Sequence, residues 1–341
     1  MSGDRIRGAF AGLAVGDAAG WPAARHRAAV HAPWSRRLHR ELDTFAEEHA
    51  VTTLPVPFAL NQPTAPLAIG PSDDAEWLVW TVLTIDRPRA EAFRELIAGG
   101  EQEGQRAGRR PGIREGVRAR ISVATALDNL ARGVEPPASG HDNPHHFDDA
   151  AAVRAVAFGV LGRDPTPDAE VTNAADGILA AQAMAAAVRE AVASGAIGPA
   201  VEAALAVLPQ DTAIGHNARV ALAAARKAGD AFAAVPALDA ALLDHVYSYG
   251  VGAAQTVPVA LALAEAAGGE LAAAVPAAVC LATLADSAPA LAGALAGACG
   301  GYEAIPEGWT ASARTLAGCC LPDLAGKDLI GLTSHFTEGI A

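Results

Sequence analysis

The sequence predicts an all-α protein, a compact orthogonal bundle of many helices in a single domain over residues 1–341. Segments with apolar residues at helical spacing dominate the chain. No segment shows the sustained two-residue alternation, rich in Val, Ile and Thr, that is typical of strands. Hydrophobic residues make up 51% of the chain but aromatic residues only 5%, so most apolar side chains are small. We therefore expect helices that approach one another closely.

Two glycine-patterned segments are expected to form the centre of the bundle. Residues 4–18 and the segment from residue 288 onward each carry glycines at four-residue spacing, which places them on one face of a helix. The two sets are Gly8, Gly12 and Gly16, and Gly293, Gly297 and Gly301. Because each glycine lowers helix propensity, we expect close helix packing at these faces in return.

Further helices are expected between these two, separated by joints rich in Pro and Gly. Their ranges are 74–85, 89–99, 112–132, 149–161, 175–194, 198–208, 218–228, 238–246, 256–267 and 271–284. Residues 21–70 contain several prolines and scattered charges without a clear period. That stretch is expected to be a partly irregular insertion within the single domain.

Charge and hydropathy exclude some classes of partner. The chain has 25 Lys and Arg against 38 Asp and Glu, a net charge of -13, whereas nucleic acids and anionic membranes are bound by basic surfaces. The uncharged run over residues 246–264 contains Tyr, Ser, Gln, Gly and Pro, which argues against a membrane span there. The N-terminus lacks the features of a signal peptide, so we expect a cytoplasmic protein without nucleic-acid or membrane partners.

Three consecutive oxygen-bearing side chains precede the helix expected at 74–85. They are Ser72, Asp73 and Asp74. One interpretation is a capping box formed by Asp73 and Glu76, since acidic groups are favoured at a helix N-terminus. The alternative is a cation site, because a hydroxyl and two carboxylates are the hard oxygen ligands that Mg²⁺ or Ca²⁺ takes.

A second oxygen pair, Asp286 and Ser287, precedes the glycine-patterned segment near the end of the chain. Ser287 fits an ordinary N-cap, with Pro289 in the first helical turn. Asp286 is the only charged residue between positions 271 and 301. Because an unpaired buried carboxylate is costly, we expect it to meet a cation, hydrogen-bond donors or solvent.

Five segments together resemble, in order and spacing, the motifs of the ADP-ribosylglycohydrolases. They are GAFAGLAVGDAAGWP (8–22), PSDDAEW (71–77), DDAAAVRAVAFGVL (148–161), VTNAADG (171–177) and ADSAPALAGALAGACGG (285–301). The resemblance implies the orthogonal all-α bundle of that family, with a binuclear Mg²⁺ site in a cleft. It also implies hydrolysis of the C1″ glycosidic bond of ADP-ribose joined to a side chain or a small molecule.

The resemblance implies one metal site more clearly than two. The implied metal ligands are Ser72, Asp73, Asp74, Asp286 and Ser287. Two acidic residues of the family pattern are replaced, by Leu284 and by Ala24. We therefore expect one Mg²⁺ and a weakened or absent second ion.

The resemblance also implies a substrate cleft, with departures from the family pattern. Asp149, Ala150 and Ala151 fall on the loop that approaches diphosphate and ribose, and Asn173 replaces a histidine. The extra acid at position 149 disfavours an anionic ligand unless a cation or an arginine compensates for it. Tyr249 is expected either to stack on a base or to be a buried core residue.

These residues predict a hydrolase in which Asp74 or Asp286 accepts a proton from the attacking water. The substrate would be a small ribosyl or ADP-ribosyl compound, possibly attached to a protein. Two alternatives stay open. One is a catalytically weakened member that binds a nucleotide-like ligand, and the other is an enzyme redirected to a less anionic, secondary-metabolic substrate.

Overall fold

The computed structural model describes residues 2–21, 44, 47–48, 70–97, 113–243 and 250–334, and these residues form helices and connecting loops without a β-strand. The α-helices are α1 (Ser2–Trp21), α4 (Asp73–Leu83), α5 (Arg89–Arg94), α7 (Ile121–Ala131), α8 (Ala138–His141), α9 (Ala150–Val160), α10 (Thr166–Thr172), α11 (Asp176–Ser194), α12 (Ile197–Val207), α13 (Ala213–Ala228), α14 (Ala231–Leu242), α15 (Ala253–Ala266), α16 (Leu271–Cys280), α17 (Ala288–Gly300), α18 (Glu307–Ala313) and α19 (Leu329–Thr333). Short 3-10 turns are η3 (Ala282–Leu284), η4 (Tyr302–Ala304) and η5 (Pro322–Leu324). The predicted all-α class is confirmed.

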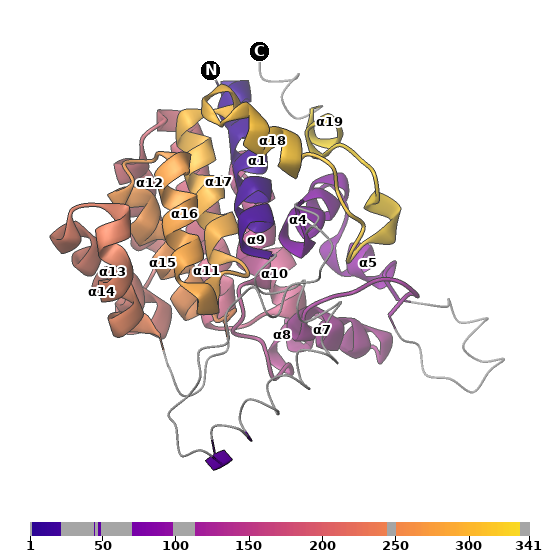
Figure 1. The fold of residues 1–341 in the computed structure, drawn as a ribbon. Helices are drawn as coiled ribbons and strands as arrows, with labels where there is room; N and C mark the ends of the chain where they lie inside the picture. Colours follow the sequence, from indigo (N-terminus) through magenta and orange to yellow (C-terminus); the bar gives the residue numbers. More distant parts are fainter. Residues whose placement is uncertain are drawn as a thin grey trace.

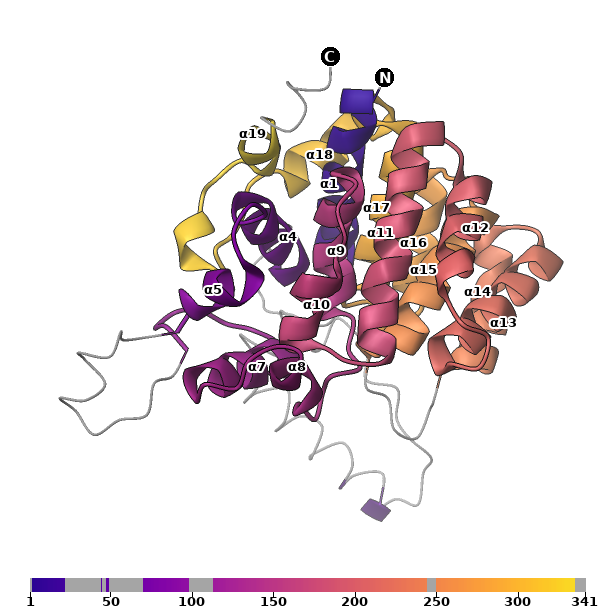
Figure 2. The same cartoon turned by 180° about the vertical axis from the view of Figure 1, so that it is seen from behind.

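Helices α1 and α17, from opposite ends of the chain, lie side by side in the middle of the bundle (Figure 1). Helices α9 and α11 cover them on one side, and both views place α12 to α14 on one flank and α4, α5 and α7 on the other (Figure 2). Almost every residue of α17 is buried. It is a central helix with apolar residues on all sides, which accounts for its lack of a polar face.

The expected glycine contact joins α1 and α17. A Cβ atom added to Gly12 would lie 2.1 Å from the carbonyl oxygen of Gly293, and one added to Gly8 would lie 2.1 Å from that of Gly297. Gly16 faces the carbonyl of Pro289 in the same way, at 2.0 Å. Any larger side chain at these positions would therefore push the two helix backbones apart.

Several helix boundaries differ from the expected ones. The helix expected over 112–132 begins only at Ile121, because Arg120 is extended and the N–H of Arg118 donates to the carbonyl of Cys320 at 2.8 Å. The segment expected to be helical over 271–284 breaks after Cys280 and continues as η3. Helices α8, α10, α18 and α19 were not expected, and most of the insertion at 21–70 lies outside the described residues.

A buried ion network joins α5, α9 and α10. Asp168 accepts from Nε of Arg89 at 2.8 Å and from Nε of Arg154 at 2.7 Å, and all three side chains are almost fully buried. Burial alone would raise the pKa of Asp168, but the guanidinium groups of Arg154 and Arg89 bring it below its ordinary value. The side chain of Arg154 also lies over the ring of Phe93.

Candidate functional site

Four helices begin at one buried cluster of charged side chains. Helix α4 starts at Asp73, while Arg120, Asp149 and Ser287 are the residues that immediately precede α7, α9 and α17. The positive ends of helix dipoles therefore meet there, and such ends favour carboxylates. The sequence thus gathers its acidic residues where the backbone itself stabilises negative charge.

The guanidinium of Arg120 lies in the middle of this cluster. Its Nη2 is 2.6 Å from Oδ1 of Asp74, 2.6 Å from Oγ of Ser287 and 3.3 Å from Oδ2 of Asp286. One nitrogen thus contacts oxygens from the starts of both α4 and α17. These are three of the side chains that the sequence predicts to hold a metal ion.

The other nitrogens of the same guanidinium contact two more carboxylates. Nε lies 3.4 Å from Oδ2 of Asp73, and Nη1 donates to Oδ1 of Asp149. The side chain of Arg120 is only 6% exposed. One positive charge is therefore shared among four carboxylates in a region that excludes water.

Ser72, the remaining predicted ligand, points to a different acid. Its Oγ donates to Oδ1 of Asp17 at 2.5 Å and lies 3.2 Å from Oδ1 of Asp73. Oδ2 of Asp17, on α1, accepts from the backbone N–H groups of Ser72 at 2.7 Å and of Ala75 at 3.0 Å. Asp17 thereby caps α4 from another helix, and no side chain of the α4 start makes a cap bond of its own.

Burial and mutual repulsion raise the pKa values of three carboxyl groups here, those of Asp17, Asp74 and Asp149. Burial, and then the charge of Asp73, raise the pKa of Asp17 to about 7. Burial raises the pKa of Asp149 to about 7 although Arg120 opposes the shift. The pKa of Asp74 also lies well above its ordinary value, chiefly because of burial and despite Arg120. At neutral pH the cluster therefore carries less negative charge than it would if every carboxyl group were ionised.

The residues present do not fit Mg²⁺ while Arg120 keeps this position. A Mg²⁺ ion needs oxygen ligands at about 2.0–2.1 Å in octahedral geometry. The oxygens of Asp74, Asp286 and Ser287 that face one another enclose a guanidinium nitrogen instead. Four of the five predicted ligand side chains thus meet here, without Ser72, and the cation at their centre is an arginine that the sequence analysis did not identify.

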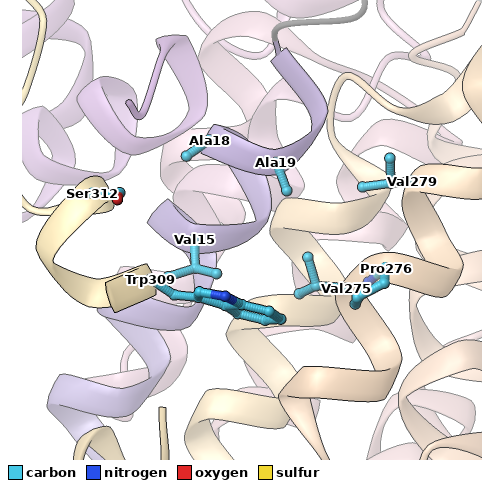
Figure 3. Close-up of a pocket in the computed structure, with 8 residues that line it drawn as sticks. All are labelled: Val15, Ala18, Ala19, Val275, Pro276, Val279, Trp309 and Ser312. Carbon is cyan, nitrogen blue, oxygen red and sulfur yellow. The ribbon is translucent and has the colours of Figure 1, made fainter. Parts of the chain in front are cut away.

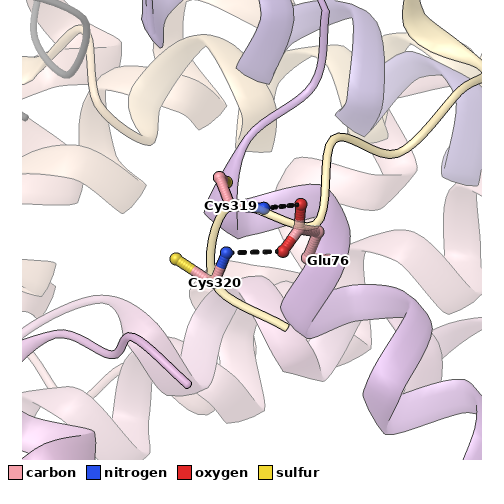
Figure 4. Close-up of side chains that lie close together, drawn as sticks. All are labelled: Glu76, Cys319 and Cys320. Carbon is pink, nitrogen blue, oxygen red and sulfur yellow. Dashed lines mark hydrogen bonds between the residues drawn. The ribbon is translucent and has the colours of Figure 1, made fainter. Parts of the chain in front are cut away.

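Another group of side chains has residue types and spacing that could hold a metal ion. Glu76, Cys319 and Cys320 offer ligand atoms within 4.8 Å of one another. The carboxylate of Glu76, however, accepts the backbone N–H groups of Cys319 and Cys320, each at 2.8 Å (Figure 4). It also accepts the N–H of Leu321 at 2.8 Å. It therefore anchors residues 319–321 to α4, and its expected capping-box partner, Asp73, is turned toward Arg120 instead.

The residues expected to contact substrate have mixed positions. Asp149 forms an ion pair with Arg120, so an arginine compensates its charge. Ala150 and Ala151 are buried in the first turn of α9. Asn173 is fully buried, and its amide donates to the carbonyl of Asp148 at 3.0 Å and to its carboxylate at 2.9 Å. Asn173 thus fixes the loop before α9 from beneath.

Three further positions from the sequence analysis complete the comparison. Leu284, which replaces an expected acid, is fully buried in the hydrophobic core at η3. Ala24 and Tyr249 lie outside the described residues. Leu284 thus supplies no ligand to a second ion.

An apolar cavity of about 420 Å³ lies beside α1, α16 and α18 (Figure 3). Its walls include Val15 and Ala18 of α1, Val275 of α16 and the indole ring of Trp309. At 100° per residue, Asp17 projects from the face of α1 opposite to these side chains. The residues that line this cavity include no titratable side chain.

Comparisons with known proteins agree with this fold. The family model for the ADP-ribosylglycohydrolases matches residues 2–337. A solved structure described as an ADP-ribosylglycohydrolase-related protein complex is similar over 99% of this chain and 98% of its own, with a TM-score of 0.55 and 18% identity. No curated protein matches the chain in sequence. None of the described helices is both long and apolar enough to cross a bilayer.

The fold and the match to the family model define a helical protein of the glycohydrolase type. The chain belongs to the ADP-ribosylglycohydrolase family, which is a family of hydrolases. The family and the all-α architecture that the sequence predicts are thereby confirmed.

Proposed function

We propose that this protein hydrolyses the glycosidic bond of an ADP-ribosyl or related ribosyl compound at the Arg120 cluster. The observation that carries this proposal is the convergence of Asp73, Asp74, Asp149 and Asp286 on one guanidinium. Glycosidic hydrolysis needs one carboxyl group that gives a proton and one carboxylate that takes a proton. In a cluster of acids whose charges interact, one carboxyl group can hold a proton while another is ionised, so the cluster can supply both the proton donor and the proton acceptor.

Asp286 is the proposed general base. Its side chain is 12% exposed, more than the other carboxylates on Arg120, so it is the one that water reaches most readily. It would take a proton from the water that attacks C1″. The contact from Nη2 of Arg120, at 3.3 Å, holds the carboxylate in place.

Asp74 is the proposed proton donor. Oδ1 of Asp74 accepts from Arg120 at 2.6 Å, whereas Oδ2 is buried without a hydrogen-bond partner. The raised pKa of Asp74, caused chiefly by burial, favours a proton on this carboxyl group. As the C1″ bond breaks, that proton would pass to the leaving atom, and the hydroxyl of the water would remain on C1″.

The charge of the cluster favours a neutral part of the substrate next to it. Four carboxylates face one guanidinium, and a diphosphate brought directly against them would be repelled. We therefore expect the ribose hydroxyls to contact the carboxylates and any phosphate to lie further out. Ribosyl compounds without a diphosphate should be accepted at least as well as ADP-ribosyl compounds.

A second candidate function is binding of a nucleotide-like ligand without turnover. The observation in its favour is the burial of the site, because Asp149 and Ser287 are fully buried and Asp73 and Asp74 are nearly so. A reaction centre with so little access to water would turn over slowly or not at all.

Hydrolysis of defined conjugates separates the two candidates. The full chain is incubated with ADP-ribosyl peptides joined through N- and O-glycosidic bonds and with a ribosyl conjugate that lacks the diphosphate, and free sugar is measured by chromatography. Asp286→Asn and Asp74→Asn should each lower the rate at least about 10²-fold. Asp86→Asn is the matched control, since Asp86 forms an exposed ion pair with Arg163. Saturable binding without release of sugar would support the second candidate, and neither binding nor release would reject both.

A further inference from the structure

We infer that Arg120 is a built-in replacement for a divalent cation, so that the wild-type protein does not take Mg²⁺ at this cluster and gains a Mg²⁺ site when the arginine side chain is removed. This inference rests on the geometry of the cluster and does not require that the protein be active.

The two cations would compete for the same space. Nη2 of Arg120 lies 2.6 Å from an oxygen of Asp74 and 2.6 Å from the oxygen of Ser287. A Mg²⁺ ion bound to those oxygens at about 2.0–2.1 Å would overlap that nitrogen. Only one of the two can therefore be present.

The backbone before α7 explains why the arginine reaches this position. Arg120 has an extended conformation, with φ -62° and ψ 162°, and immediately precedes the first helical residue. The N–H of Arg118 is bound to the carbonyl of Cys320 at 2.8 Å, and Glu76 in turn binds the N–H of Cys320 at 2.8 Å. Cys320 thus links the residues before α7 to α4, because its carbonyl binds Arg118 and its N–H binds Glu76 of α4.

The position of Arg120 is unfavourable for a cation unless nearby carboxylates neutralise its charge. A positive charge at a helix N-terminus opposes the helix dipole, and burial of a guanidinium without partners is strongly unfavourable. The bonds to the carboxylates from α4 and α9 offset both costs. Conversely, those buried carboxylates would repel one another strongly without a cation between them.

Removal of the arginine would leave a set of oxygens suited to Mg²⁺. Oδ2 of Asp74 and Oδ2 of Asp149 are already buried without a hydrogen-bond partner. Loss of the guanidinium would also free Oδ1 of Asp74 and Oγ of Ser287. Carboxylate and hydroxyl oxygens are hard ligands, and the vacated volume could admit the waters that Mg²⁺ retains.

The test is a titration of the full chain with MgCl₂ alone. Calorimetry measures the binding, and the melting temperature is determined at each Mg²⁺ concentration. Wild-type protein should bind no Mg²⁺ at this cluster, and neither Mg²⁺ nor EDTA should move its melting temperature. Arg120→Ala should bind one Mg²⁺, and Mg²⁺ at about 100 times its Kd should raise the melting temperature of this variant by a few degrees.

Two controls assign the new ion to this cluster. Adding Asp74→Asn to Arg120→Ala should abolish the binding. Arg114→Ala, which removes an arginine from an exposed pair with Asp323, should gain no Mg²⁺ site. If Arg120→Ala folds only when Mg²⁺ is present, that dependence supports the inference equally.

Wild-type titration alone can overturn the inference, whatever the fate of the variant. One Mg²⁺ bound by the wild-type chain and lost in Asp74→Asn would show that Arg120 leaves the cluster for the ion. A folded Arg120→Ala variant without affinity for Mg²⁺ would also contradict it. Because neither readout involves turnover, failure here is distinguishable from failure of the proposed hydrolase activity.

Discussion

The carboxylate of Asp17, on α1, accepts a hydrogen bond of 2.7 Å from the backbone N–H of Ser72 at the start of α4. The same oxygen accepts the N–H of Ala75 at 3.0 Å. These two donors are among those that a helix start leaves without partners. The first helix thereby fixes the start of α4, and with it the acidic residues that reach Arg120.

Loss of this cap should weaken the fold locally. Asp17→Ala leaves two N–H groups without a partner, and we expect a loss of about 1–2 kcal/mol in the free energy of unfolding. Asp17→Asn should lose less, because its amide oxygen can still accept. Urea unfolding gives the free energy, and hydrogen exchange of the Ser72 and Ala75 amides locates the change. Unchanged exchange at these amides in Asp17→Ala would refute the cap.

The contact between α1 and α17 should not tolerate a methyl group. In Gly12→Ala the new Cβ would lie 2.1 Å from the carbonyl oxygen of Gly293, so the helices must separate, at a cost of about 3 kcal/mol. Gly198→Ala is the matched control, because an added Cβ there meets nothing within 4 Å. The control should be neutral or slightly stabilising. Denaturant midpoints compare the two, and equal midpoints would contradict the close packing.

Acid should remove the contribution of the buried Asp168 network. Because the guanidinium groups of Arg154 and Arg89 hold the pKa of Asp168 below its ordinary value, its folded state binds fewer protons than its unfolded state. Its contribution is therefore fully present above about pH 4, the unfolded pKa, and is lost as the pH falls through the lower folded pKa.

Asp168→Asn should cost about 3–5 kcal/mol at pH 7, because it leaves buried arginines without their counter-ion. Below pH 4 its unfolding free energy should fall with pH less steeply than that of the wild type. Asp323→Asn, in an exposed pair, should keep the wild-type slope. Parallel curves for Asp168→Asn and wild type between about pH 2 and 4 would disprove the assigned linkage.

Glu76 should be needed to hold residues 319–321 against α4. In Glu76→Ala the N–H groups of Cys319, Cys320 and Leu321 lose their common acceptor. We expect faster exchange of these amides and a loss of about 2–3 kcal/mol in the free energy of unfolding. Glu95→Ala, which removes an exposed partner of Arg87, is the control and should change stability by less than about 1 kcal/mol. Protected amides at 319–321 in Glu76→Ala would contradict this anchor.

Local patterns were sufficient for much of the fold and for part of the site. The four-residue spacing of Gly12 and Gly293 with their neighbours predicted a close helix pair, and the structure has it between α1 and α17. Asp74 and Ser287 are 213 positions apart in the sequence. The prediction that they lie close together came from the motif resemblance rather than from any local signal. Both residues now contact the same nitrogen of Arg120.

Arg120 could not be identified in the same way. It lies in a stretch with several arginines that was expected to be the interior of a helix over 112–132, where its side chain would be one solvated charge among others. Its role depends on the later start of α7, which depends in turn on a hydrogen bond from Arg118 to Cys320. No local pattern records a bond between such distant segments.

The sequence by itself determined most of the longer helices and the runs of acidic residues, because helical periodicity, glycine spacing and runs of oxygen-bearing side chains depend only on residues within a few turns of one another. The tertiary structure decided which partners the buried charged side chains bind. Asp17 caps a helix other than its own, Glu76 binds three backbone groups near the C-terminal end of the described chain, and Arg120 lies among the carboxylates. Buried charges must find partners wherever packing brings them, because the cost of leaving them unpaired exceeds the preferences of any single helix.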